Sequence, residues 1–139
     1  MSVFTTSIAL STKGERNTKN LTPAVTNAVE ECGLYNGVVT VFVPGSTAGI
    51  TTIEFEPGAV EDLSDAFERI APKDNDYAHN ERWGDMNGFS HVRAAMLGPS
   101  VTIPFSEGRL LLGTWQQVVL VDFDNRARNR EVHIHVIGE

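Results

Sequence analysis

Cysteine, basic charge and long apolar runs are scarce in this sequence, and each scarcity excludes a class of protein. The single cysteine, Cys32, rules out an intramolecular disulfide. It falls on the apolar stripe of a predicted helix, which favours a buried and unreactive thiol. The formal net charge of −7 provides no basic field to attract nucleic acid or an anionic membrane, so we expect neither as a partner.

Segments that anchor or export a protein are missing as well. No stretch approaches the roughly 18 apolar residues of a membrane-spanning helix. The first residues of the chain have neither the basic flank nor the apolar run of a secretory signal. We therefore expect a cytoplasmic protein.

What the chain does contain suits one globular domain. Its 139 residues are enough for one buried core and too few for two ordinary domains. A hydrophobic content of 41% with 21% charged residues is too apolar for a disordered chain. We expect a single domain over residues 1–139.

Hydrophobic periodicity and turn residues predict the order of helices and strands. Thr22 as N-cap, Pro23 after it and Gly33 as a stop mark a first helix, and Asn87 caps a later one. The pattern predicts two to three helices, over 22–32, 57–70 and, shorter, 89–97. It predicts strands over 3–11, 38–43, 48–55, 101–105, 110–123 and 130–137.

Helices and strands alternate early, whereas strands follow one another at the end. This order indicates an α+β fold, a single compact domain with a largely antiparallel β-sheet. The continuous apolar run 38–43 predicts a strand that is buried on both faces.

Two histidines stand out as candidates for chemistry. His79 lies in the polar loop 72–85, and loops longer than about 12 residues are usually functional or disordered. His91 lies in the first turn of the third helix. Neutral imidazoles bind zinc and similar ions, and they also act as general acid or base without a metal.

The histidines alone do not complete a metal site, because such a site needs three or four ligands. Glu54, Asp85 or a water molecule would have to supply the others. The alternative is that one histidine packs locally and the other is solvated. Farther along, His133 and His135 alternate on a strand, a pattern more typical of a polar outer face, and we leave them outside the site.

The side chains of three alternating arginines project from one face of the chain if the backbone is extended: Arg126, Arg128 and Arg130. Guanidinium groups on one patch suit a phosphate or diphosphate, because each planar fork makes two charge-assisted hydrogen bonds. The alternative is a charged turn that nearby acids neutralise, namely Asp122, Asp124 and Glu131.

Polar residues at strand ends are further candidates for the wall of a cleft. Thr47 and Glu54 border one predicted strand. Trp115 and Gln116 offer a stacking surface and an amide for a planar heterocycle. Packing of Trp115 in the core or at a subunit contact is the commoner explanation for such a residue.

Several segments, in this order and spacing, resemble the YjbQ family, also called the secondary thiamine-phosphate synthase family. The resemblance covers nearly the whole chain, and its most specific parts are Asn-Gly-x-x-His and Leu-Gly-Thr-Trp-Gln. The segments are 46–51, Glu54, 62–63, 77–79, 87–91, 97–98, 108–110, 112–116 and 128–130.

The resemblance implies a compact domain that assembles as a homotrimer, with polar residues gathered near the subunit boundaries. It also implies a weak activity, which joins an aminopyrimidine-methyl diphosphate to a thiazole phosphate with loss of diphosphate. A small phosphorylated metabolite is thus the expected ligand, and a divalent ion, zinc or magnesium, is a possible cofactor.

Carried over residue by residue, the resemblance implies a role for each matching side chain. His79, His91 and Asn87 would be catalytic, with His79 and His91 also the metal ligands. The substrate-binding residues would be Glu54, Tyr77, Thr114, Trp115, Gln116, Arg128 and Arg130.

One position departs from the family pattern. Relatives usually have a histidine directly before the small-residue segment, and this chain has Gly45 there, followed by Ser46. If that histidine is a metal ligand or acid/base group in relatives, this chain has lost it. Gly45 thus favours one alternative to the transferase, a trimer that binds a phosphorylated metabolite without turnover. A second alternative is a metal-dependent hydrolase, which would need a complete set of metal ligands.

Overall fold

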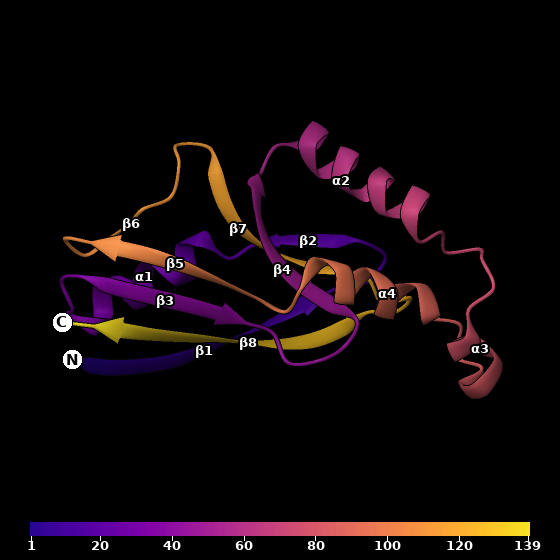
Figure 1. Ribbon diagram of the computed structural model, residues 1–139, viewed down its shortest axis with the longest axis horizontal. Helices are drawn as coiled ribbons and strands as arrows, with labels where there is room; N and C mark the ends of the chain where they lie inside the picture. The colour runs from indigo at the N-terminus through magenta and orange to yellow at the C-terminus, as the bar shows by residue number, and fades with distance from the viewer.

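The computed structural model describes all residues, 1–139, and contains four helices and eight strands (Figure 1). The first half holds β1 (Ser2–Thr12), β2 (Asn17–Asn20), α1 (Thr22–Cys32), β3 (Gly37–Phe42), β4 (Ala48–Glu54) and α2 (Pro57–Ile70). The second half holds α3 (Ala78–Trp83), α4 (Gly88–Leu97), β5 (Ser100–Ser106), β6 (Arg109–Leu110), β7 (Gln116–Asp122) and β8 (Arg128–Gly138).

The strands form two sheets in which every pairing is antiparallel. The five-stranded sheet has the order β1-β8-β3-β5-β6, and the three-stranded sheet has the order β2-β7-β4. The α+β fold with largely antiparallel pairing is therefore confirmed, although the strands divide into two sheets and four helices are present.

The three-stranded sheet lies in the middle of the molecule and is buried on both faces. Val118 and Leu120 of β7 belong to the larger core, which α1 and the five-stranded sheet also build. Val119 and Val121 point the other way, into a smaller core with Phe67 of α2. This alternation fixes the register of β7, because a slip by one residue would exchange its two faces.

The prediction that the strand over 38–43 is buried on both faces is therefore wrong. In β3, Val39 and Val41 are buried, whereas Val38 is 38% and Phe42 is 40% exposed. The five-stranded sheet has one covered face, so β3 alternates in burial. The doubly covered strand is β7.

Local details also differ from the sequence prediction. The predicted loop 72–85 contains the short helix α3, and the polar strand β2 was not predicted. The predicted strand 110–123 is interrupted before β7 by a turn, in which Gln116 N–H donates to Gly113 O at 3.0 Å. Thr22 does not cap α1; its Oγ1 accepts the Val118 N–H at 2.8 Å and so ties the helix to β7.

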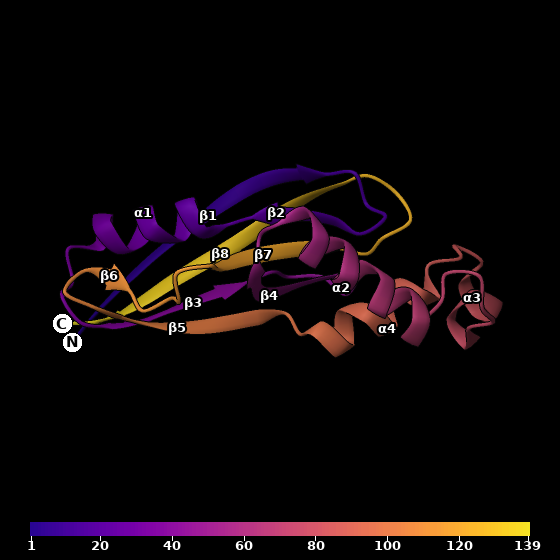
Figure 2. The ribbon, with the colours of Figure 1, turned by 90° about the horizontal axis from the view of Figure 1, so that it is seen from above.

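The helices α2, α3 and α4 gather at the end of the molecule that lies away from both termini, and α3 is the outermost element (Figures 1 and 2). No helix has the length and apolarity needed to cross a membrane. The loop between β3 and β4 and the C-terminal end of β7 reach toward this helical end, which places them near the predicted histidines.

Candidate functional site

His79 of α3 and His91 of α4 lie face to face. Their ring centroids are 4.3 Å apart, with an angle of 41° between the planes. The contact depends on how α3 packs against the start of α4. Asn80 Oδ1 accepts the Gly88 N–H at 2.9 Å, and the Tyr77 hydroxyl donates to Pro72 O at 2.7 Å.

Tyr77 is therefore part of the support for the histidines. Its hydroxyl is occupied by the hydrogen bond to Pro72, and burial raises the pKa of the phenol. A Cβ on Gly88 would come within 2.5 Å of Tyr77 Cβ, so the glycine permits this close approach.

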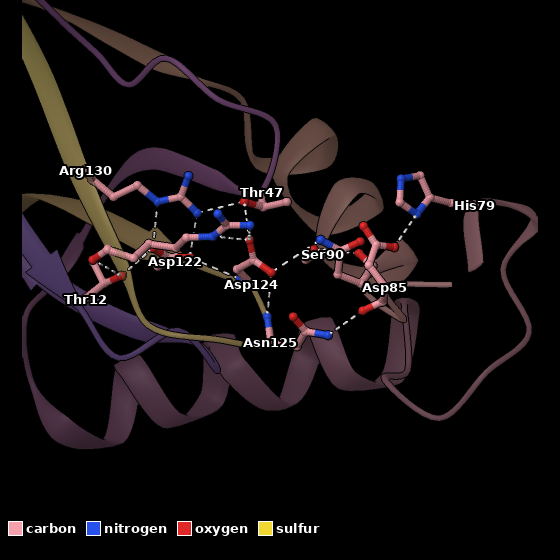
Figure 3. Close-up of polar contacts among 11 residues, drawn as sticks. Thr12, Thr47, His79, Asp85, Ser90, Asp122, Asp124, Asn125 and Arg130 are labelled. Carbon is pink, nitrogen blue, oxygen red and sulfur yellow. Dashed lines mark hydrogen bonds and ion pairs between the residues drawn. The ribbon is translucent and has the colours of Figure 1, made fainter. Parts of the chain in front are cut away.

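Asp85 provides the carboxylate beside His79. His79 Nδ1 lies 3.4 Å from Asp85 Oδ1, and this nitrogen is buried without a hydrogen bond of good geometry (Figure 3). Asn87 is buried between two acids, and its amide nitrogen reaches only one of them at a time: in one orientation Nδ2 donates to Asp124 Oδ1 at 3.3 Å, and in the reversed orientation the nitrogen lies 3.0 Å from Asp85 Oδ1. Asn87 therefore lies between the acid beside His79 and the acids behind the site.

Those acids, Asp122 and Asp124, are completely buried and paired with arginines. Arg130 donates to Asp122 through Nε at 2.7 Å and through Nη2 at 2.9 Å. Arg128 Nε donates to Asp124 Oδ2 at 2.7 Å. Thr47 Oγ1 joins the two pairs, because it donates to Asp124 Oδ2 at 3.0 Å and accepts from Arg130 Nη2 at 2.7 Å (Figure 3).

The environment of Asp124 favours its charged form. Burial by itself raises the pKa of a carboxyl group. Hydrogen bonds outweigh that effect here and hold the pKa of Asp124 below its ordinary value; they come from Arg128, the Asn125 N–H, Asn87 and Thr47.

The three arginines do not converge on one open patch. Arg126 is exposed, whereas Arg128 and Arg130 are bound to the two buried aspartates, as the alternative interpretation of the sequence described. Arg128 retains 31% exposure of its side chain, and Arg130 retains 9%. Both guanidinium groups are held in place, and only part of each remains available to a ligand.

A cavity of about 230 Å³ opens beside His91, between α4 and the loop that joins β3 to β4. His91 is the one ionisable side chain in its wall. The other lining residues are small or apolar: Gly45, Ser46, Ala48, Ala94, Ala95 and Pro99. The departure from the family pattern at Gly45 therefore lies in the wall of the same cavity as His91.

Four of the predicted residues lie elsewhere. Glu54, Thr114 and Trp115 line a second cavity of about 450 Å³, and Gln116 Nε2 donates to Thr52 Oγ1 at 3.0 Å. The β4–β7 ladder separates the two places, because Ala48 pairs with Asp122 at one end and Glu54 with Gln116 at the other. Six residue steps along a strand span roughly 20 Å. One chain therefore does not bring all predicted site residues to one small ligand.

The histidines do not form a metal centre with the other side chains of this chain. No group of three or more His, Cys, Asp or Glu side chains is arranged to hold a metal ion. With glycine at position 45, His79 and His91 lack a third protein ligand. A metal here remains a prediction that needs a ligand from a substrate or another subunit.

The residues that the sequence prediction left out mostly support the others. Asp85 was considered only as a metal ligand, and the structure makes it the partner of His79. Thr12 donates to Asp122 from β1, a contact between distant parts of the chain that no local pattern signals. The spacing Asp-x-Asp before Arg-x-Arg did signal the two ion pairs.

Comparisons with known proteins place these features in a family. The sequence model of the family described as "UPF0047 protein YjbQ-like" matches residues 6–139. A UPF0047 protein of Methanothermobacter thermautotrophicus is 34% identical over 139 residues, which are 100% of this chain and 95% of that protein. A UPF0047 protein of Mycobacterium tuberculosis is 42% identical over 103 residues, 73% of this chain and 76% of that one.

Solved structures agree with this match. The crystal structure of a YbjQ-like protein of unknown function from Sulfolobus solfataricus superimposes with a TM-score of 0.94 at 32% identity, over 99% of both chains. An uncharacterised conserved protein of the yjbq/upf0047 family from Clostridium acetobutylicum gives a TM-score of 0.87 at 34% identity, over 95% of this chain and 99% of that chain.

Proposed function

The chain belongs to the YjbQ-like UPF0047 family, and from this membership and the cavity beside His91 we propose that it binds a small phosphorylated metabolite. The observation that carries the proposal is that the His79–His91 pair lies close to the network of Arg128 and Arg130, with Asn87 between Asp85 and Asp124. Guanidinium groups bind phosphate oxygens through charge-assisted, often bidentate hydrogen bonds, and an imidazole beside them can act as general acid or base.

As the reaction we propose a transfer of the thiamine-phosphate synthase type. The ring nitrogen of a thiazole phosphate attacks the methylene carbon of an aminopyrimidine-methyl diphosphate. The new C–N bond forms as the C–O bond breaks, and the diphosphate leaves with that electron pair. Groups that stabilise the charge on the leaving diphosphate contribute most to such a step.

We assign the residues of this chain to different roles in that step. His91 faces the cavity and is suited to donate a hydrogen bond to the leaving oxygen. His79 has the Asp85 carboxylate beside it and holds the ring of His91 in place by direct contact. Arg128, the more exposed of the two paired arginines, adds positive charge at the edge of the site.

We further propose that a homotrimer joins the two separated groups of site residues. Trp115 is 72% exposed and Phe55 beside it is 45% exposed, which is unusual for aromatic side chains without a partner. In a trimer, the Glu54–Trp115 cavity of one subunit would face the His91 cavity of the next. The aromatic surface would then stack on the pyrimidine.

The test is the formation of thiamine phosphate by the purified protein, with His91→Ala as the variant and His133→Ala as the control. His133 lies on β8 outside the site. His91→Ala should lower the rate by about 100-fold, the usual contribution of an acid/base group, with His133→Ala unchanged. Equal rates for both variants would refute the assigned role.

A second candidate is a binding protein without turnover, and Gly45 favours it because an acid/base or metal-binding side chain is absent there. The two candidates differ in one result. If phosphorylated ligands bind in the His91 cavity while no product forms from both substrates together, the binding protein is correct and the transferase is not.

A further inference from the structure

We infer that the loop Gly45–Thr47 and the free end of Arg130 form an oxyanion subsite for the phosphate of a phosphate monoester with a compact apolar body. This inference rests on the proposed function and gives it a place and a ligand class. It assigns the anion to Arg130 and the loop, and the body of the ligand to the cavity beside His91.

The guanidinium group of Arg130 is fixed on one side and open on the other. Its Nε and Nη2 make three hydrogen bonds, two to Asp122 and one to Thr47. Nη1 makes none, and Figure 3 shows this nitrogen pointing away from the network. The side chain is nine-tenths buried, so its orientation is set before any ligand arrives.

The open nitrogen lies behind Gly45. A Cβ built on Gly45 would lie 3.2 Å from Arg130 Nη1, and no other atom outside residues 44–46 comes within 4 Å of that position. The φ angle of Gly45 is +122°, a conformation that glycine adopts and other residues avoid. The missing side chain therefore leaves a path from the cavity wall to the guanidinium group.

The loop itself supplies further donors. Thr47 O accepts a hydrogen bond from Phe123 N–H, but the N–H groups of Gly45, Ser46 and Thr47 donate to no group of the protein. Successive free N–H groups near a glycine with positive φ are a common way to hold an anion. Together with Arg130 Nη1, they match the several acceptor oxygens of a phosphate.

The rest of the cavity selects the body of the ligand. Ala48, Ala94, Ala95 and Pro99 form an apolar wall with short side chains, and the volume of about 230 Å³ admits one small ring. Phosphate monoesters of small heterocycles or short carbon chains fit this description. A nucleotide is too large for it, because its base and sugar would both need enclosure.

The test uses calorimetric titration in phosphate-free buffer with two probes, inorganic phosphate and phenyl phosphate. Gly45→Ala places a methyl group in front of Arg130 Nη1. Its control is Gly108→Ala, which also puts a side chain on a glycine of positive φ (+70°) but has nothing within 4 Å. Gly45→Ala should weaken the binding of both probes by about tenfold, as expected for the loss of one charged hydrogen bond. Gly108→Ala should leave the binding of both probes unchanged.

A second variant tests the cavity independently of the loop. Ala95→Leu narrows the apolar wall, and Met96→Leu, one residue along on the same helix and outside the lining, is its control. Ala95→Leu should remove the preference for phenyl phosphate over inorganic phosphate while inorganic phosphate still binds. Met96→Leu should preserve both the binding of inorganic phosphate and the preference for phenyl phosphate.

The outcomes separate this inference from the function on which it rests. If the wild-type protein binds the probes and neither Gly45→Ala nor Ala95→Leu changes this binding, the proposed subsite is wrong. The proposal of a phosphorylated ligand would then stand, with its site elsewhere. Binding of neither probe to the wild-type protein would overturn both.

Discussion

The buried carboxylate of Asp124 connects the two functional groups of this site. It accepts hydrogen bonds from Arg128 and Thr47 on one side and from Asn87 on the other. A buried ion pair of this kind contributes little by its mere presence, yet the loss of one partner is costly because the other charge stays buried. Asp124 therefore fixes the orientation of Arg128, Thr47 and Asn87.

Asp124→Asn should lower the free energy of unfolding at pH 7 by about 3 kcal/mol, because the Arg128 guanidinium loses its partner. The pKa of Asp124 is lowered in the folded protein. Its contribution is therefore complete above the ordinary carboxyl pKa of about 3.9 and is lost as the pH falls through the lower folded-state value. The difference between wild type and variant should shrink in that acidic range.

Urea unfolding as a function of pH checks this, with Asp74→Asn as the control for charge. Asp74 is exposed and forms no ion pair, so its variant should match the wild type within about 0.5 kcal/mol. The assigned role of Asp124 would be contradicted if the loss of unfolding free energy in Asp124→Asn stayed unchanged below pH 4. It would also be contradicted if both variants lost the same unfolding free energy.

One arginine fixes the position of α4, the helix that carries His91. Arg93 is 1% exposed; its Nε donates to Ala71 O at 2.9 Å, just after α2, and its Nη2 donates to Glu68 Oε2 at 2.6 Å. Its guanidinium group also lies over the ring of Phe89, 4.9 Å from the centroid. These contacts join α2 and α4, whose Phe67 and Ala94 also belong to the smaller core.

Arg93→Met keeps most of the apolar volume but leaves the buried carbonyl of Ala71 without a donor. The free energy of unfolding should fall by about 2–4 kcal/mol, and phosphate binding should weaken as α4 moves. Arg69→Met, on the exposed face of α2, is the control and should change stability by less than about 0.5 kcal/mol. Similar stability of the two variants, measured in urea, would show that the helices are joined in another way.

The sequence allowed those elements to be predicted whose signals are local. Pro23 and Gly33 correctly marked the first helix, and the apolar run 38–43 correctly marked a strand but not the burial of its two faces. The short strand β2 is polar throughout and is held by pairing with β7, so nothing in its own residues indicated it.

The sequence singled out candidate residues for the site but not their arrangement. Both histidines were identified, but their contact depends on the packing of α3 against α4 around Gly88. The separation of Trp115 from His91 depends on the length of the β4–β7 ladder, which no motif encodes. Distances between elements are set by packing, and a pattern of residue types does not specify them.

The molecule as a whole carries two groups of site residues, one at each end of its central three-stranded sheet. The proposed homotrimer explains both, and it makes a prediction about mixed assemblies. Light scattering should give a mass of three times 15.2 kDa. A mass of one chain would remove the explanation for the Trp115 group.

Mixed trimers test whether the two groups work together. His91→Ala and Trp115→Ala should each be inactive alone. Co-expressed, they should recover about a quarter of the wild-type activity, because each site takes its two halves from different subunits at random. No recovery would mean that both groups act within one chain or that Trp115 serves another purpose.

The measurement that addresses the central claim most directly is a crystal structure of the protein grown with a saturating concentration of thiazole phosphate. The account predicts the phosphate within hydrogen-bonding distance of Arg130 Nη1 and the loop amides of Gly45–Thr47, with the ring against Ala94 and Ala95 beside His91. An empty cavity, or a phosphate bound away from Arg130, would contradict it.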